Sequence, residues 1–223
     1  MPSTDIEQVN RWIFGKLNAD TTLVSAVGVH PELNVPQFYA MGAPQNTLLS
    51  VQINLPNANV GSTSLAVNLT TGKFAQIPPG SYFTNSGKVI TVSNSNIVNG
   101  SGTITVSPIS VSLVSGDFFT VVLPQIIFRF VGGNVKRGTG GRKIFSKLTY
   151  IIKAICAGDS MAPVISLAAE IEKQFQVSQL DGDTVIIGCS ITQPICYDEV
   201  LESGTRVFHF GHMLEIMAYN NIT

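Results

Sequence analysis

The sequence is poor in charged residues, cysteine and tryptophan, and these shortages exclude several classes of protein. Asp, Glu, Lys and Arg make up 12% of the 223 residues, about half of the usual share of roughly 25%. The formal net charge of −1 excludes a generally basic nucleic-acid binder. A hydrophobic share of 44% and a mean hydropathy of +0.29 exclude a disordered chain. So few charges leave much of the surface to uncharged polar residues or to contacts with other subunits.

Three cysteines, Cys156, Cys189 and Cys196, form no C-x-x-C pair. An odd number of widely spaced cysteines predicts reduced thiols in a protein made in a reducing cytoplasm. The first ten residues contain neither a basic region nor an apolar run, so we expect no secretory signal. No stretch approaches 18 consecutive apolar residues, and we therefore expect no membrane partner.

The few charged residues are unevenly placed along the chain. Residues 50–127 carry only three of them. Residues 128–158 carry seven cations and no acid, whereas residues 159–223 carry nine acids and two cations, a net charge of −7. This separation suits head-to-tail association, in which a basic element of one copy meets an acidic face of the next. The alternative is that both sets are ordinary solvated faces.

A glycine-rich basic segment is the candidate contact element of the positive block. Five glycines within residues 132–141 predict a mobile hairpin tip that orders on contact with a partner. A solvated tip without a partner is the alternative. The candidate contact residues of this basic loop are Lys136, Arg137, Arg142 and Lys143, and those of the acidic counter-face are Asp181, Asp183, Asp198, Glu199 and Glu202.

Helical patterns occur near the start of the chain and again in its second half. Thr4 to Glu7 form a capping box, and apolar residues follow at helical spacing up to Leu17. Residues 21–27 predict a second, short helix. A third amphipathic helix is expected to begin at Asp159 or Ser160.

Strand-like patterns dominate the remaining sequence. Residues 50–123 are rich in Val, Ile, Thr, Ser, Asn and Gly, show no helical period, and predict a nearly uncharged inserted domain. Strands are expected in this segment at 64–69, 80–84, 88–92, 102–106 and 118–123, and outside it at 35–41, 125–131, 143–156, 184–192 and 206–219.

These elements predict an α+β fold, with helices packed on one face of a mainly antiparallel sheet. Residues 1–49 and 124–223 form the host domain. The all-β inserted domain, residues 50–123, interrupts it.

No motif in the sequence supports catalysis, a metal or a cofactor. His209 and His212 are three apart in a predicted strand, so they face opposite sides and cannot easily share a metal ion. Residues 133–138 resemble the opening of a phosphate loop, but the Gly-Lys-Ser/Thr ending is absent. Cys196 has no base near it in the sequence, and the pair Asp198-Glu199 is typical of surface carboxylates. We therefore expect a protein that is not an enzyme.

Three segments of the chain resemble those of a known family. They are the opening helix that ends in Leu-Asn-Ala-Asp and continues to residue 28, residues 147–154 with the helix around 168–172, and the closing strand 208–219. Together they resemble the small neck proteins of tailed phages, the family of tail terminators and tail-completion proteins. The inserted segment 50–123 makes this chain longer than the compact members.

The resemblance implies a non-enzymatic virion protein that assembles in the host cytoplasm. It implies rings, commonly of six subunits, that cap the tail tube and present a surface to the head connector. DNA would pass through such a ring without specific binding. Because tight cationic contacts would hold phosphates and retard the DNA, we expect the basic loop to contact protein. The alternatives are a head-side stopper protein and a carbohydrate-binding β-protein that uses the inserted domain as its binding module.

Overall fold

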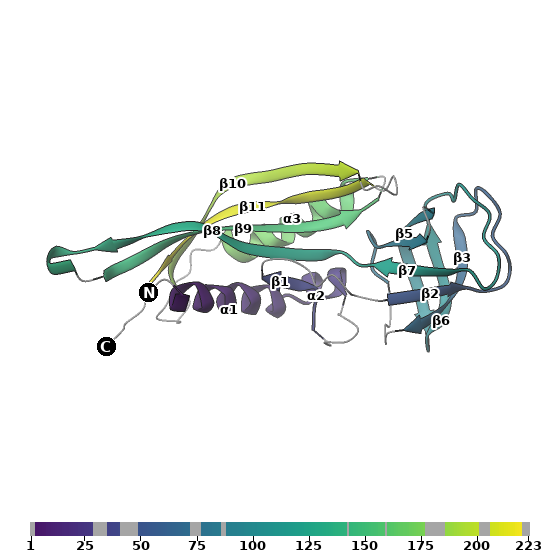
Figure 1. The fold of residues 1–223 in the computed structure, drawn as a ribbon, viewed down its shortest axis with the longest axis horizontal. Helices are drawn as coiled ribbons and strands as arrows, with labels where there is room; N and C mark the ends of the chain where they lie inside the picture. Colours follow the sequence, from purple (N-terminus) through teal and green to yellow (C-terminus); the bar gives the residue numbers. More distant parts are fainter. Residues whose placement is uncertain are drawn as a thin grey trace.

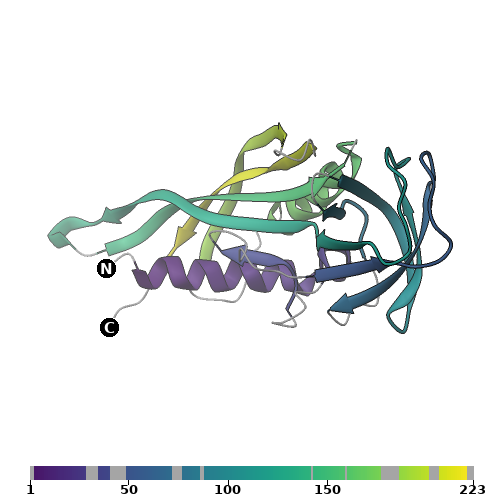
Figure 2. The ribbon, with the colours of Figure 1, turned by 45° about the vertical axis from the view of Figure 1, so that its right-hand side comes forward.

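The computed structural model describes residues 3–28, 35–40, 49–71, 77–85, 88–141, 143–158, 160–176, 186–200 and 206–219 (Figure 1). The described chain is elongated. A closed barrel lies at one end, a five-stranded sheet lies in the middle, and a two-stranded hairpin projects from the other end (Figures 1 and 2).

The three predicted helices are confirmed among the described residues. The Asp20 side chain caps the second helix by accepting hydrogen bonds from the backbone N–H groups of Thr22 and Leu23, at 2.8 and 3.0 Å. The hydroxyl of Ser160 accepts from the N–H of Ala162 at 3.1 Å and so begins the third helix. The bounds are α1 Ser3–Ala19, α2 Thr21–Val27 and α3 Ala162–Gln176.

The central sheet has the strand order β1-β8-β9-β11-β10. Strand β1 pairs with β8 in parallel, and the other neighbours are antiparallel, so the sheet is mixed. The bounds are β1 Phe38–Ala40, β8 Gln125–Arg137, β9 Lys143–Ala157, β10 Ile186–Val200 and β11 Arg206–Ala218.

Six further strands close into a barrel in the order β2-β3-β6-β5-β4-β7. Closure pairs every strand edge of the barrel. A segment of short, nearly uncharged strands therefore has no exposed edge that could pair with another chain. The first barrel strand, β2, is not among the strands predicted from the sequence. The bounds are β2 Leu49–Ile53, β3 Ser64–Thr71, β4 Tyr82–Asn85, β5 Lys88–Val98, β6 Ser101–Val106 and β7 Phe118–Val122.

The predicted fold class, α+β with helices packed on one face of a mainly antiparallel sheet, is wrong. Strands hold 56% of the described residues and helices 22%. The chain is mainly β, with a closed six-stranded barrel, a mixed sheet and three helices in the described part. The prediction failed because strand pairing, which local patterns do not show, closes the inserted segment into a barrel and adds β2 to it, pairs β1 with β8 in parallel, and extends β8 and β10 further than their sequence patterns indicate.

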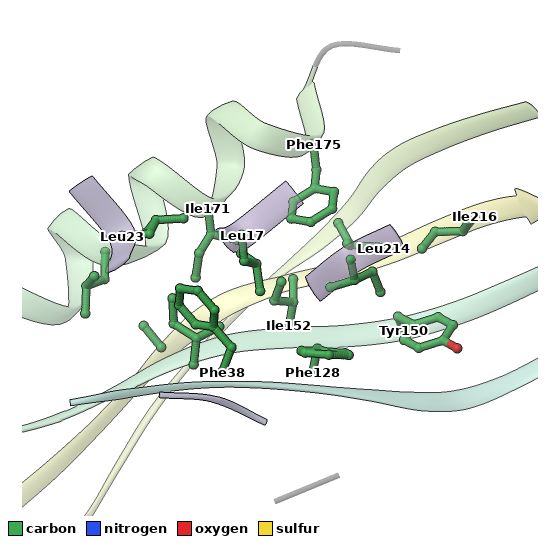
Figure 3. Close-up of a cluster of buried hydrophobic side chains, with 14 of the residues drawn as sticks. Leu17, Leu23, Phe38, Phe128, Tyr150, Ile152, Ile171, Phe175, Leu214 and Ile216 are labelled. Atoms are coloured by element: carbon green, nitrogen blue, oxygen red, sulfur yellow. The ribbon is translucent and has the colours of Figure 1, made fainter. Parts of the chain in front are cut away.

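Barrel and sheet bury separate hydrophobic clusters. The sheet cluster joins side chains of the helices to those of the central strands, including Leu17, Phe128, Ile152 and Phe175 (Figure 3). The barrel cluster is formed by barrel strands and their connecting segments. Alternate residues of β9 and β11 enter the sheet cluster, as the period of two in the sequence predicts. We call the sheet face that carries the cluster the core face, and the opposite face the outer face.

Barrel and sheet meet at a tight turn. Gly80 has a φ of 83°, a conformation that glycine adopts without cost. Its carbonyl accepts a hydrogen bond from the N–H of Ala157 at 3.1 Å. Tyr82 of β4 packs against Ile155, Ala157 and Val207 of the sheet. The barrel is therefore anchored at the end of β9 that is farthest from the projecting hairpin (Figure 1).

Candidate functional site

The projecting hairpin is formed by the outer halves of β8 and β9, and we call it the arm. The predicted hairpin is present, but its strands extend further than expected, because β8 continues through Gly132 and Gly133 to Arg137 and pairs with β9. A side chain at Gly133 would place Cβ 2.6 Å from the backbone oxygen of Lys147, so glycine permits this pairing. Only the short turn after Arg137 joins the two strands.

The arm exposes apolar and basic side chains together. Val131, Val135 and Ile144 are exposed, so this part of the hairpin buries little of its apolar surface. Lys136 is exposed and forms no ion pair with the described residues. Arg137 is exposed and donates from Nη1 to the carbonyl of Gly141 at 3.0 Å. The other two predicted contact residues cannot be placed: Arg142 lies outside the described residues, as does the side chain of Lys143.

The described part of the acidic counter-face lies on β10 and is paired within the chain. Asp198 Oδ2 accepts from Arg206 Nε at 3.1 Å, and Glu199 Oε1 lies 2.9 Å from His209 Nε2. Both carboxylates are about half exposed and remain accessible to a partner. Asp181, Asp183 and Glu202 lie outside the described residues.

A cluster of polar side chains lies on the outer face, where β9, β11 and β10 run side by side. Lys153 Nζ donates to Tyr197 Oη at 2.5 Å and contacts His209 Nδ1 at 3.1 Å. The rings of Tyr197 and His209 stack at 4.4 Å between centroids. Because the ammonium group can only donate, Nδ1 accepts and His209 Nε2–H donates to Glu199.

Burial controls the proton affinity of this histidine. His209 is 5% exposed. Desolvation lowers the pKa of His209 from its ordinary value of 6.5; the hydrogen bond with Glu199 opposes this effect, and the Lys153 ammonium adds to it. The neutral imidazole is therefore favoured in the folded protein.

The lowered pKa of His209 predicts a loss of stability in mild acid. As the pH falls through about 6.5, the unfolded chain binds a proton that folded His209 resists, so the free energy of unfolding decreases. In His209→Gln this decrease should be smaller. Urea denaturation across the range from neutral to mildly acidic pH measures it, and an unchanged pH dependence in the variant would contradict the assignment.

A hollow of about 320 Å³ opens on the outer face beside this cluster. It spans β8, β9 and β10, and its walls combine branched aliphatic side chains with two cations and a phenol. The lining residues are Ile127, Arg129, Ile151, Lys153, Ile195 and Tyr197.

The histidine pair behaves as the strand spacing predicted. His209 lies on the outer face, whereas His212 lies on the core face, 3.8 Å from Glu172 of α3. No group of three His, Cys, Asp or Glu side chains in the described part of the chain could hold one metal ion. Burial raises the pKa of Cys156 and of Cys189 to about 12, so both thiols stay protonated at neutral pH.

Sequence reasoning did not single out Arg129, Lys153 or Tyr197. These residues belong to no recognisable sequence motif. The register of the strands brings them together on one face. Lys153 of β9 lies opposite Ile127 of β8 and Gly211 of β11, and Gly211 lies opposite Ile195 of β10.

Comparison with models of protein families, with curated proteins and with solved structures found no match. Among the helices that the structure describes, none combines the length and the apolar character needed to cross a bilayer.

Proposed function

We propose that this chain is a ring-forming structural subunit of the phage head–tail neck, of the tail-terminator kind. In this proposal the ring caps the tail tube and joins it to the head connector. Neighbouring copies associate head to tail, with the basic arm of one copy on the acidic end of β10 in the next. The family resemblance of the sequence supplies the biological setting, and the placement of the opposite charges supplies the assembly mode.

The observation that carries the proposal is the distance between the basic and acidic ends. Lys136 pairs with Phe145 at one end of β9, whereas Glu199 pairs with Val207, which pairs with Ala157 at the other end. At about 3.3 Å per residue these positions on β9 are about 40 Å apart. They therefore cannot meet within one subunit. Opposite charges at opposite ends of one sheet are complementary only between copies, which is the arrangement of a heterologous interface.

The exposed surface of the arm supports a protein partner. Val131, Val135 and Ile144 lie in a two-stranded ribbon that has no core of its own, and such ribbons are marginally stable in water. Strand β10 is a sheet edge over its full length, and exposed edges accept a further strand. Apolar contact and edge pairing would add to the charge attraction in a closed ring.

Charge reversal on the arm tests this assembly. We expect the unmodified protein to form rings that dissociate at 1 M salt, where the Debye length is about 3 Å. Lys136→Glu with Arg137→Glu should stay monomeric, because the arm would then repel the acidic end of β10. The matched control is Arg11→Glu with Lys88→Glu, two cations away from the arm, which should leave the rings intact. Light scattering at low and high salt provides the measurement.

Two results would contradict the assembly mode. One is an unmodified protein that remains monomeric well above micromolar concentration. The other is a Lys136→Glu, Arg137→Glu variant that forms the same rings as the control. Electron microscopy of particles with a labelled copy tests the biological setting: label at the head-proximal end of the tail tube is expected of a terminator, and label on tailless heads would assign a head-side stopper.

A further inference from the structure

The hollow on the outer face has an apolar floor and a cationic rim. Ile127, Ile151 and Ile195 come from three different strands and supply aliphatic surface. Arg129, Lys153 and Tyr197 supply N–H and O–H donors around it. Donors grouped beside aliphatic surface are the composition of a small-molecule site, and about 320 Å³ is the lower end of the usual size range.

The hollow exists because one strand contributes no side chain to it. In the register, Ile127, Lys153, Gly211 and Ile195 form one row across β8, β9, β11 and β10. Gly211 leaves the row open between Lys153 and Ile195. The space is therefore part of the folded sheet and needs no loop to form it.

The positive charge at the hollow is not neutralised by its neighbours. Lys153 Nζ is held by the Tyr197 hydroxyl and by His209 Nδ1, and neither partner carries a negative charge. The carboxylate next in this network, Glu199, contacts the far nitrogen of His209. Arg129 is exposed and forms no ion pair or hydrogen bond with the described residues. Two cations on adjacent strands thus lack an anionic partner.

We propose that this hollow binds an aliphatic carboxylate. The carboxylate lies between Arg129 and Lys153 and accepts charge-assisted hydrogen bonds from both. The aliphatic group covers the isoleucine floor, where burial of apolar surface favours binding. A phosphate fits less well, because it needs more donors to replace its hydration and the three isoleucine side chains provide none. A ligand of leucine size is expected, either the carboxy-terminal residue of a polypeptide or a free aliphatic acid.

The binding experiment compares ligands that differ in one property. Full-length ¹⁵N-labelled protein is titrated by NMR with N-acetyl-leucine, and the expected dissociation constant is about 1 mM for so small a ligand. N-acetyl-leucine amide has the same aliphatic group without the charge and should bind at least about tenfold more weakly. Inorganic phosphate should likewise bind more weakly. Hexanoate separates the two sources: tighter binding than N-acetyl-leucine assigns a free acid, and weaker binding assigns a polypeptide terminus.

Substitutions in and beside the hollow complete the test. Arg129→Gln and Lys153→Met should each weaken binding of N-acetyl-leucine about tenfold, whereas Lys153→Arg should retain it. Lys147→Gln is the matched control: Lys147 lies on the same strand and face, but pairs with Glu215 at 2.7 Å and does not line the hollow. If Lys153→Met does not fold, the binding of N-acetyl-leucine to Arg129→Gln alone tests the proposal.

The proposal is overturned if the amide or phosphate binds as tightly as N-acetyl-leucine, or if Arg129→Gln binds it as tightly as the Lys147→Gln control. Because binding is measured on the purified chain, the result is independent of whether the protein forms rings.

Discussion

Replacing Gly211 with alanine is expected to leave little folded protein. Gly211 lies in β11, between β9 and β10. An added Cβ would lie 2.1 Å from the carbonyl oxygen of Ile152 and 2.5 Å from the Cα of Lys153. These are backbone atoms of the neighbouring strand, so relief requires the two central strands to separate. Distorting the backbone to this extent costs about 4 kcal/mol or more, a large part of the 5–15 kcal/mol that stabilises an ordinary domain.

Gly188→Ala is the matched control for Gly211→Ala. Gly188 also lies in the central sheet, on β10, but its added Cβ would meet only the terminal methyl of Met217, at 2.8 Å. A flexible methionine moves at low cost, so the free energy of unfolding should change by less than about 1 kcal/mol. Urea denaturation followed by circular dichroism compares the two variants. Equal midpoints would contradict the close approach of β9 and β11 at Gly211.

Phe175→Ala is expected to lower the free energy of unfolding by about 3–5 kcal/mol. Phe175 is 1% exposed and points from α3 into the sheet cluster (Figure 3). Its ring and that of Trp12 of α1 lie in a T-shaped arrangement, with centroids 5.6 Å apart. Truncation removes this contact between the two helices and leaves a cavity in the cluster. Thermal or urea unfolding of the full chain measures the loss.

The control for the phenylalanine truncation is Phe118→Ala, at the start of β7. This side chain is 53% exposed, so its removal should change the stability by no more than about 0.5 kcal/mol. A Phe175→Ala variant as stable as Phe118→Ala would show that α3 contributes little to the folded state.

Local patterns were enough to predict the elements that depend on near neighbours. The capping box Thr4 to Glu7, the pattern of residues 21–27 and the predicted Ser160 cap each act within a few residues, and the three helices lie where they indicate, although α1 begins one residue earlier, at Ser3. Alternation predicted β9 well: Leu148, Tyr150, Ile152 and Ala154 are all buried. Ile144, which the same alternation places on that side, is exposed, because it lies in the arm beyond the reach of the core.

Local patterns could not predict how far the strands extend or which strands lie at the edges of the sheet. The glycines after Val131 indicated a loop, yet β8 continues because β9 supplies backbone partners. Pro194 lies within β10, which is tolerated because β10 is an edge strand and needs fewer backbone donors. Neither fact is visible before the strand order is known.

By itself, the sequence determined the helices, the face of most central strands and the separation of positive from negative residues, since these depend on residue type and on periods of 3.6 or 2. Only the tertiary structure decided that strands β2 to β7 close into a barrel. Only it decided that the basic and acidic ends lie at opposite ends of β9, and that Arg129, Lys153 and Tyr197 surround one hollow. Such groupings depend on cross-strand register, which joins residues dozens of positions apart and leaves no local signal in the chain.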